Sequence, residues 1–424
     1  MKSADLRKRI CILTYGHLAT TPRMVKAADA LAEAGFAVSV VSTRSTDWAD
    51  AGDADIVRRR LGSWAWTTVD YGRRSLVRYL HSGIRQKICR GLTRLFGPTR
   101  VGLGIAALAR DRVFPELVNK ACEIPFDFIY GGGGSLVATA YAARRTGVPF
   151  AIDLEDFHST DQDPAKDGKF LNDLTDRTER ELLRSAALRT GGSAEISAAY
   201  TAKYGVAVET VNNTFPCEFS NSSGQPGNGP LRLFWFSQTI GPGRGLEDVI
   251  IAAGQTDLEM ELHLQGRDIP AYTRSLSELQ KQSAPKLQLT LHEPGMPDEM
   301  ISECSRYDVG IASEETRTRS RELALTNKAL SYVAAGIAVA FTDTAGQRRL
   351  ARDLGTGALV FSPGDVKTLA DGLQRWSNDR ELLTRAKHEV QLAASRRWNW
   401  ESGGDKATLL AAIQRVLTSD TVEQ

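Results

Sequence analysis

A glycine-rich loop that carries one arginine is the first candidate for chemistry in this sequence. The loop, SQTIGPGRGLED from Ser237 to Asp248, follows an apolar run and precedes an amphipathic stretch. Glycines let backbone N–H groups approach a phosphate, and the N-terminus of a following helix adds partial positive charge. Arg244 adds a full charge and is a candidate catalytic residue, because it can stabilise a departing diphosphate. The residues expected to contact the phosphates are Gln238, Gly241, Gly243, Arg244 and Gly245. A tight turn with a solvated arginine is the structural alternative.

A second candidate lies at the predicted start of a helix that Gly336 ends. Thr326 is a plausible N-cap, so the backbone N–H groups of the next two residues would point at an anion. The residues expected to contact the same donor molecule are Glu322, Thr326, Asn327, Lys328 and Ser331. The structural alternative is a helix that Leu330 and Val333 pack against a core.

An acidic turn in the first half of the chain is the third candidate. It follows a predicted strand that ends at Leu154, and ligands of doubly wound sheets bind outside the carboxyl ends of strands. Three residues there can orient or deprotonate an acceptor hydroxyl, and we predict them as catalytic: Glu155, Asp156 and His158. A solvated acidic turn that caps the next helix is the alternative. In the loop after the first strand, Gly16 is expected to contact the donor and His17 the acceptor.

Strand and helix patterns alternate around these candidates. An apolar run from Arg9 to Tyr15 is followed by a helix pattern that opens at Pro22 and stops at Gly35, and then by a second apolar run from Phe36 to Ser42. Continuous apolar runs are typical of buried parallel strands, and apolar spacings of three and four are typical of helices. Similar units recur to the end of the chain, so the sequence predicts α/β domains with open, parallel, doubly wound sheets.

The length of 424 residues and a stretch of linker composition predict two such domains. The stretch CEFSNSSGQPGNGP, residues 217–230, is rich in Ser, Gly, Pro and Asn and has the composition of a linker. The first domain is predicted to span residues 1–216 with a terminal helix at 402–424, and the second to span 231–401. A hydrophobic content of 42% is enough for two cores and argues against disorder.

The cysteines and the apolar runs bear on the cellular compartment. Five scattered cysteines without a C-x-x-C spacing argue against a disulfide framework and a zinc site, and they favour a reducing compartment. No apolar run approaches the length of about 18 residues that a membrane span requires. The basic start, Arg7 to Arg9, leads directly into a strand-like run instead of a signal peptide. The sequence therefore predicts a cytoplasmic protein, and it shows no metal site.

Positive charge is concentrated between Arg58 and Arg112. This stretch contains thirteen Lys and Arg residues and two acidic residues, Asp70 and Asp111. Within this stretch, Leu76–Phe96 places apolar residues at helical spacing beside basic ones. A basic amphipathic helix of this kind can lie on an anionic membrane, which would make the protein peripheral on the inner membrane face. A core helix with a solvated basic face is the alternative. Nucleic acid is not an expected partner, because no supporting motif accompanies the charge.

Several of these segments resemble the GT-B glycosyltransferases of the family 4-like group, and the similarity covers nearly the whole chain. The loop Ser237–Leu246 resembles the phosphate-binding loop of the family, and Asn327–Val339 resembles its most specific donor-site stretch. Further similar segments are the Pro22-Arg23 helix start, Ala34–Val38, Val211–Thr214, Tyr307–Ala312, Asp343–Gly346 and Trp400-Glu401.

The resemblance implies two Rossmann-like domains, with a nucleotide-sugar donor bound mainly by the second and an acceptor bound by the first. It implies that a sugar is transferred, with retention of configuration, to a glycan, lipid-linked or small-molecule acceptor. The nucleotide-sugar is then a co-substrate, and Arg244 with the helix start at Asn327 would do what a divalent ion does elsewhere. The last helix is expected to cross back to the first domain.

Three segments depart from the family pattern. Gln238 stands where the phosphate loop usually has its first basic residue, and Ser331 stands where a glutamate usually contacts the ribose. Glu155-Asp156 falls near the place of the catalytic histidine that some members have. Two alternatives follow: a catalytically reduced scaffold protein of this fold, and a sugar-nucleotide epimerase of this fold.

Overall fold

The computed structural model describes residues 7–217, 219 and 229–419, and the chain divides into two compact units. The N-terminal unit spans Met1–Val211 together with Lys406–Gln424, and the C-terminal unit spans Asn212–Asp405. The predicted end of the first domain, residue 216, lies a few residues beyond Val211. Most of the predicted linker, residues 217–230, falls outside the described residues.

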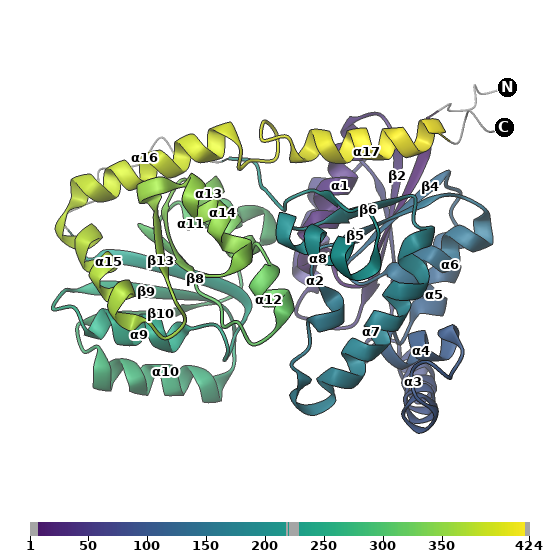
Figure 1. Ribbon diagram of the computed structural model, residues 1–424, viewed down its shortest axis with the longest axis horizontal. Coiled ribbons are helices and arrows are strands. Elements are labelled where there is room, and N and C mark those ends of the chain that lie inside the picture. Colours follow the sequence, from purple (N-terminus) through teal and green to yellow (C-terminus); the bar gives the residue numbers. More distant parts are fainter. Residues whose placement is uncertain (1–6, 218, 220–228, 420–424) are drawn as a thin grey trace. The chain divides into compact units, whose positions relative to one another are not determined.

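The N-terminal unit is built on a seven-stranded sheet with the order β3-β2-β1-β4-β5-β6-β7 (Figure 1). Every pairing in this sheet is parallel. The strand order reverses between β1 and β4, which is where doubly wound sheets bind ligands. The strands are β1 (Arg9–Thr14), β2 (Ala37–Arg44), β3 (Ala65–Asp70), β4 (Phe128–Gly132), β5 (Phe150–Leu154), β6 (Leu188–Gly191) and β7 (Glu209–Thr210).

The C-terminal unit contains a six-stranded parallel sheet with the order β10-β9-β8-β11-β12-β13. Its order reverses between β8 and β11, so the carboxyl ends of these two strands mark the expected ligand position. Both sheets confirm the predicted doubly wound α/β class. The strands are β8 (Leu231–Ile240), β9 (Met260–Asp268), β10 (Leu287–His292), β11 (Val309–Ala312), β12 (Ala338–Thr342) and β13 (Ala358–Phe361).

Helices connect successive strands in both units, as parallel pairing requires (Figure 1). The helices of the N-terminal unit are α1 (Pro22–Glu33), α2 (Asp50–Arg59), α3 (Leu76–Phe96), α4 (Leu103–Arg110), α5 (Phe114–Cys122), α6 (Leu136–Thr146), α7 (Lys169–Leu182), α8 (Ala194–Tyr204) and α17 (Asp405–Ser419). Those of the C-terminal unit are α9 (Leu246–Gly254), α10 (Pro270–Ser283), α11 (Met300–Cys304), α12 (Arg319–Leu323), α13 (Asn327–Ala334), α14 (Ala345–Asp353), α15 (Val366–Asn378) and α16 (Arg380–Arg396).

The core of the C-terminal unit packs a tyrosine directly onto a glycine of β11. Tyr332 is fully buried on α13, and its hydroxyl donates to the carbonyl of Phe234 at 3.1 Å. A Cβ atom on Gly310 would lie 2.1 Å from Cγ of Tyr332. The strand can therefore pass beneath the ring only because residue 310 has no side chain, and this contact fixes α13 against the sheet.

Gly310→Ala is expected to lower the free energy of unfolding by about 3 kcal/mol, the upper part of the range for overpacking a close-packed core. Thermal unfolding followed by circular dichroism measures the change. Gly91→Ala is the matched control, because the space around Gly91 on α3 is open. An alanine there should leave stability unchanged or raise it by up to about 1 kcal/mol. Equal unfolding midpoints for Gly310→Ala and the wild type would contradict the packing argument.

Candidate functional site

The glycine-rich loop lies between β8 and α9, and two of its glycines need their conformational freedom. Gly243 has φ +81° and Gly245 has φ +67°, a region that other residues rarely adopt. Between them, the carbonyl of Arg244 accepts a hydrogen bond of 2.6 Å from Ser313 Oγ. The loop is therefore tied to the end of β11, and the Arg244 side chain is directed from a fixed backbone.

The loop begins later than predicted. The sequence placed the start of the loop at Ser237, but β8 continues to Ile240 and a register shift interrupts its pairing with β9 between Phe236 and Thr239. The bulge brings the less apolar residues after Phe236 into the strand. Gln238 is therefore an exposed strand residue, while Gly241 and Gly243 follow the strand.

A buried carboxylate lies at the centre of the site. Glu314, two residues after β11, is 4% exposed and contacts three cationic side chains. Its Oε1 lies 2.5 Å from Lys328 Nζ, and its Oε2 lies 2.8 Å from Arg321 Nη1 and 2.9 Å from Arg244 Nη1. We call Arg244, Arg321 and Lys328 the basic cluster. One carboxylate faces three cations, so the group keeps an excess of positive charge.

The charge state of the centre follows from these contacts. Burial alone raises the pKa of Glu314, but Lys328, Arg244 and Arg321 outweigh it and hold the pKa at about 2. Burial lowers the pKa of Lys328, which Glu314 opposes. The ammonium of Lys328 also lies 5.5 Å from the centroid of the Trp235 ring, a favourable cation–π distance. Glu314 is therefore an anion throughout the neutral range.

The start of α13 confirms the predicted N-cap. Thr326 Oγ1 accepts from the backbone N–H of Ala329 at 3.3 Å and donates to Gln347 at 3.1 Å. Asn327 accepts from Asn213 at 2.5 Å, and Lys328 turns its side chain to Glu314. The first turn of α13 thus lies beside the basic cluster and adds the partial charge of its N–H groups.

Two other predicted donor residues lie apart from these contacts. Glu322 accepts a hydrogen bond of 3.0 Å from the backbone N–H of Ala345 and so caps α14. Gly346, in the next position, allows α14 to start close to α12, because a Cβ there would lie 2.4 Å from the carbonyl oxygens of Leu323 and Ala324. Ser331 is 3% exposed on α13. Their donor contacts stay predictions.

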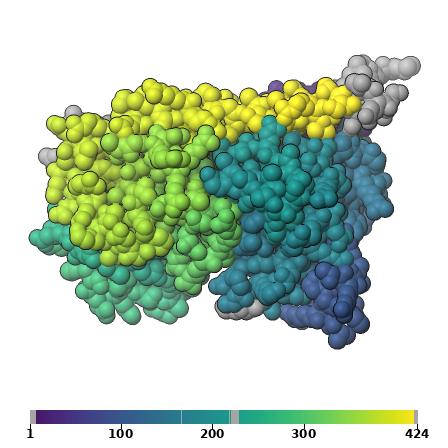
Figure 2. Space-filling model, viewed as in Figure 1, coloured from purple at the N-terminus to yellow at the C-terminus, as the bar shows by residue number. Residues whose placement is uncertain are grey.

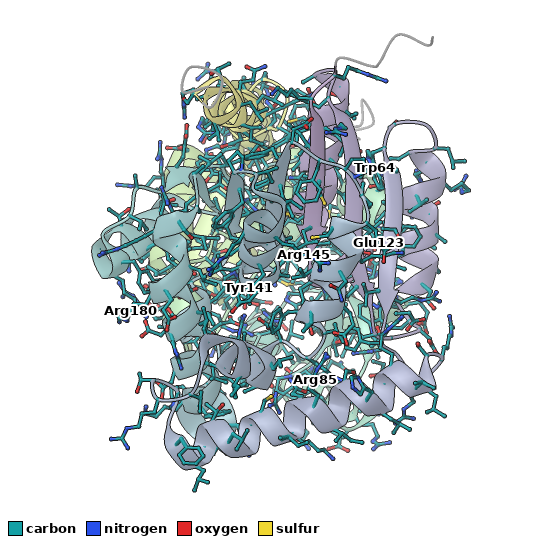
Figure 3. The ribbon with its side chains drawn as sticks, turned by 90° about the vertical axis from the view of Figure 1, so that its right-hand side faces the viewer. Trp64, Arg85, Glu123, Tyr141, Arg145 and Arg180 are labelled. Carbon is teal, nitrogen blue, oxygen red and sulfur yellow. The ribbon has the colours of Figure 1, made fainter. Side chains whose placement is uncertain are left out.

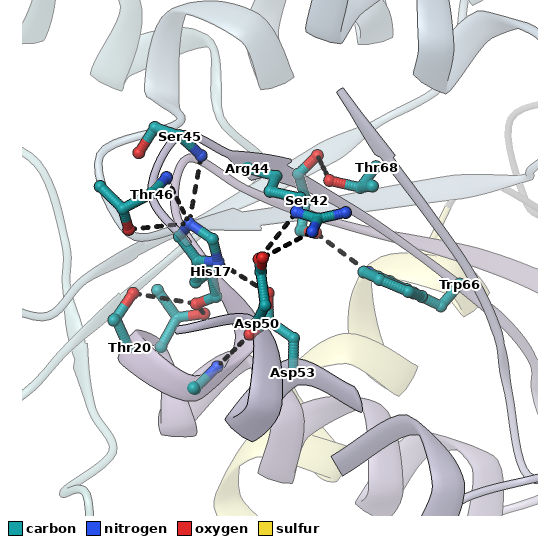
Figure 4. A network of polar contacts seen from close by, with 12 residues as sticks. His17, Thr20, Ser42, Arg44, Ser45, Thr46, Asp50, Asp53, Trp66 and Thr68 are labelled. Atoms are coloured by element: carbon teal, nitrogen blue, oxygen red, sulfur yellow. Dashed lines mark hydrogen bonds and ion pairs between the residues drawn. The ribbon is translucent and has the colours of Figure 1, made fainter. Parts of the chain in front are cut away.

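The first loop of the N-terminal unit is held by His17 (Figure 4). His17 Nδ1 lies 2.8 Å from Asp53, and Nε2 accepts from the backbone N–H groups of Ser45 at 3.1 Å and Thr46 at 3.3 Å. Since Nε2 accepts, Nδ1 carries the proton and donates to Asp53. His17 is 4% exposed, so an acceptor substrate could bind to this ring only by displacing one of these hydrogen bonds. The carbonyl of Gly16 accepts from Thr43 in the same loop.

At the carboxyl end of β5, the acidic turn begins with a buried ion pair. Asp153 is 2% exposed and accepts from Arg23 Nε at 2.8 Å and Arg23 Nη2 at 2.6 Å. Tyr130 and Thr190 donate to the same carboxylate, at 3.3 and 2.6 Å. Asp153 thus ties the start of α1 to three strands and is saturated with partners.

The next residues of the turn place further polar groups near the carboxyl end of β5. Glu155 and Asp156 are half-buried, and the carbonyl of Asp156 accepts from the hydroxyl of Tyr200 at 3.1 Å. Burial lowers the pKa of His158, so the imidazole is neutral at pH 7. Its Nε2 is buried and finds no hydrogen-bond partner within residues 7–217, 219 and 229–419. The turn therefore holds one neutral imidazole whose Nε2 is enclosed by the protein.

Sequence reasoning missed Glu314 and Arg321, which complete the centre of the site. Glu314 follows the buried strand β11, whose carboxyl end lies next to that of β8. The rule that selected Glu155 after β5 selects Glu314 equally well, because both follow strands at a ligand-binding edge. Arg321 gives no comparable signal, since its contact depends on how α12 folds back toward β11.

Comparisons with known proteins support the fold. HepE of Anabaena, in complex with UDP and glucose, has 16% sequence identity and a TM-score of 0.66 over 97% of this chain and 100% of that chain. A glycosyltransferase from Rickettsia africae has 11% identity and a TM-score of 0.62 over 97% and 99%. TarM of S. aureus, in a complex that includes UDP, has 8% identity and a TM-score of 0.66 over 96% and 99%.

These likenesses confirm the predicted GT-B fold, with two parallel Rossmann-like sheets and a C-terminal helix. No protein-family profile matches the sequence, and no curated protein sequence matches it significantly. In the part of the chain that the structure describes, no group of three or more His, Cys, Asp or Glu side chains is arranged to hold a metal ion.

Proposed function

We propose that the chain is a glycosyltransferase whose basic cluster binds the diphosphate of a nucleotide-sugar. One observation carries the proposal: three cations meet on a single buried carboxylate at the point where the order of the sheet reverses. Arg244 and Arg321 are 29% and 34% exposed in their side chains, so both can reach a ligand. An anion with two or more negative charges would complete the charge balance.

The chemistry follows from this charge. When the bond between the sugar and the diphosphate breaks, negative charge develops on the departing phosphate oxygen. Arg244 and the backbone N–H groups at the start of α13 are preorganised donors for that oxygen, and such electrostatic stabilisation is usually the largest catalytic contribution. Lys328, held by Glu314, adds positive charge without losing its position.

The acceptor would bind at the acidic turn of the N-terminal unit. Glu155 and Asp156 are half-buried and can orient the acceptor hydroxyl by hydrogen bonds. The neutral imidazole of His158 can accept the proton of that hydroxyl once acceptor binding opens access to its buried Nε2. Asp153 serves the fold in this proposal, because Arg23 already neutralises it. His17 would act indirectly, by fixing the loop after β1. Retention of configuration is part of the proposal through the family resemblance alone.

A uridine nucleotide is the first donor to test, because the structures of HepE and TarM contain UDP. Thermal shifts with UDP, GDP, CMP and ADP, and with their sugar conjugates, would identify the nucleotide. At about a hundred times its Kd, a ligand stabilises the folded protein by about 2.7 kcal/mol. We expect UDP to give a shift of this size in the wild type and little or none in Arg244→Ala.

The matched control is Arg306→Ala, which removes an exposed arginine that pairs with Glu303 in the same unit. This variant should keep the full shift. Release of nucleotide from the sugar conjugate, measured with and without candidate acceptors, then separates the functions. Release that depends on an acceptor indicates transfer, conversion of the sugar without an acceptor indicates an epimerase, and no shift with any nucleotide would favour a scaffold protein.

A further inference from the structure

The helix α3 packs onto the N-terminal unit through polar and small side chains. Its buried residues are Ser82, Cys89 and Thr93. Gln86 Nε2 and Arg90 Nε donate to backbone carbonyls at the end of α4, at 2.9 and 2.8 Å. The face toward the protein is thus the face that a solvent-exposed helix normally turns to water.

The opposite face of α3 is apolar and exposed. We call its large side chains the apolar stripe, and each of them is between 37% and 84% exposed: Leu76, Val77, Leu80, Ile84, Ile88, Leu92, Leu95 and Phe96. Of the two alternatives that the sequence left open, a core helix with a solvated basic face is therefore wrong. The helix extends for roughly 30 Å at 1.5 Å per residue, so the stripe is long and continuous.

Basic side chains border the apolar stripe on both sides. At 100° per residue, Arg78 and Arg85 follow one edge of the stripe, and Lys87 and Arg94 follow the other. Two of these pair with acids, Arg85 with Glu116 and Arg94 with Asp167. No Asp or Glu occurs anywhere between Tyr71 and Arg110 in the sequence. Figure 3 shows α3 along one edge of the N-terminal unit, with Arg85 labelled, and Figure 2 shows this segment at the surface.

We propose that α3 binds the surface of an anionic lipid bilayer and lies in its plane. The apolar stripe would enter the boundary between head groups and acyl chains, while the bordering lysine and arginines reach the phosphates of the head groups. Among the described residues, no helix combines the length and apolarity needed to cross a bilayer. The contact is therefore one of a helix that lies on a membrane.

Two partners could cover the apolar stripe, a lipid bilayer or a second copy of this chain, and the charge of α3 decides between them. A dimer through the stripe would bring two sets of arginines against each other with no acid on α3 to pair them. An anionic bilayer supplies an apolar layer beneath a negatively charged surface, which matches both properties of α3. The inference does not depend on the proposed donor site, because α3 and the basic cluster belong to different units.

Sedimentation with lipid vesicles tests the proposal on the full chain. Vesicles of phosphatidylcholine mixed with phosphatidylglycerol are compared with vesicles of phosphatidylcholine alone, each at low and high salt. We expect the wild type to bind the anionic vesicles at low salt. Ile84→Ser with Ile88→Ser should weaken this binding about tenfold or more, since two large apolar side chains leave the membrane. Arg78→Gln with Lys87→Gln should weaken binding to anionic vesicles about tenfold while sparing binding to neutral ones.

Leu392→Ser is the matched control, because Leu392 on α16 is 39% exposed and outside α3. It should bind as the wild type does, and unfolding midpoints should agree among all variants because every altered side chain is exposed. The proposal is overturned if the wild type does not sediment with anionic vesicles at low salt, or if Ile84→Ser with Ile88→Ser binds equally well. A dimer in solution that this double variant abolishes would instead assign the stripe to a second copy.

Discussion

Glu314→Gln is expected to lower the free energy of unfolding at neutral pH by about 3 kcal/mol. Removing one partner of a buried ion pair leaves the remaining charge uncompensated, which typically costs 3–5 kcal/mol. Lys328 is 7% exposed and would bear this cost, whereas Arg244 and Arg321 are partly solvated and would bear less. The pKa of Glu314 indicates a loss of the same size, because its fall from 4.5 to about 2 on folding corresponds to about 3 kcal/mol in the free energy of unfolding.

The effect should depend on pH in a defined window. The folded state holds the pKa of Glu314 below its value of 4.5 in the unfolded chain. Its contribution to stability is therefore complete above pH 4.5 and is lost as the pH falls toward 2. The difference in free energy of unfolding between the wild type and Glu314→Gln should be constant above about pH 5.5 and should shrink below pH 4.5. Urea unfolding at a series of pH values measures it.

Glu315→Gln is the matched control, because the neighbouring Glu315 pairs with Arg317 nearer the surface. Its effect should remain below about 1 kcal/mol, as for other solvent-exposed pairs. If the proposed donor site is correct, UDP should restore part of the stability of Glu314→Gln, since its phosphates replace the lost negative charge. A loss in Glu314→Gln no larger than in Glu315→Gln would contradict the central role of Glu314.

The fold class could be predicted because its signals are local in the sequence. Apolar runs and helical spacing led to a predicted helix that opens at Pro22 and to one at Leu76–Phe96, and α1 and α3 begin at these residues. The strand β3 was missed for a physical reason. It lies at the edge of its sheet and is only partly buried, so its sequence AWTTVD has no continuous apolar run.

The centre of the candidate site could be predicted only in part, because its contacts join distant residues. The loop at Arg244 and the N-cap at Thr326 are visible in the sequence through glycine and capping patterns. The pairing of Arg244 with Glu314 spans 70 residues, and no local pattern predicts it. For α3, the same apolar spacing fits a buried face and an exposed one equally well. Only the structure shows which face packs against the protein.

Arg23→Ala is the second substitution for which we expect a large effect, a loss of about 4 kcal/mol in the free energy of unfolding. Arg23 and Asp153 form two hydrogen bonds across a buried interface, with side chains 6% and 1% exposed. Without Arg23, the carboxylate of Asp153 is left, among the described residues, with the hydroxyls of Tyr130 and Thr190, which carry no charge. An uncompensated buried carboxylate accounts for the size of the loss, which chemical unfolding in urea measures.

Two further variants test whether the unpaired buried charge causes this loss of stability. Arg23→Ala with Asp153→Asn removes both charges, so it should be more stable than Arg23→Ala alone, because no buried ion is left without its partner. Arg9→Ala breaks a similar two-bond contact with Asp127, but that pair is solvated, and its loss should change stability little. If the double variant were less stable than Arg23→Ala, hydrogen bonds to Asp153 would matter more than its charge.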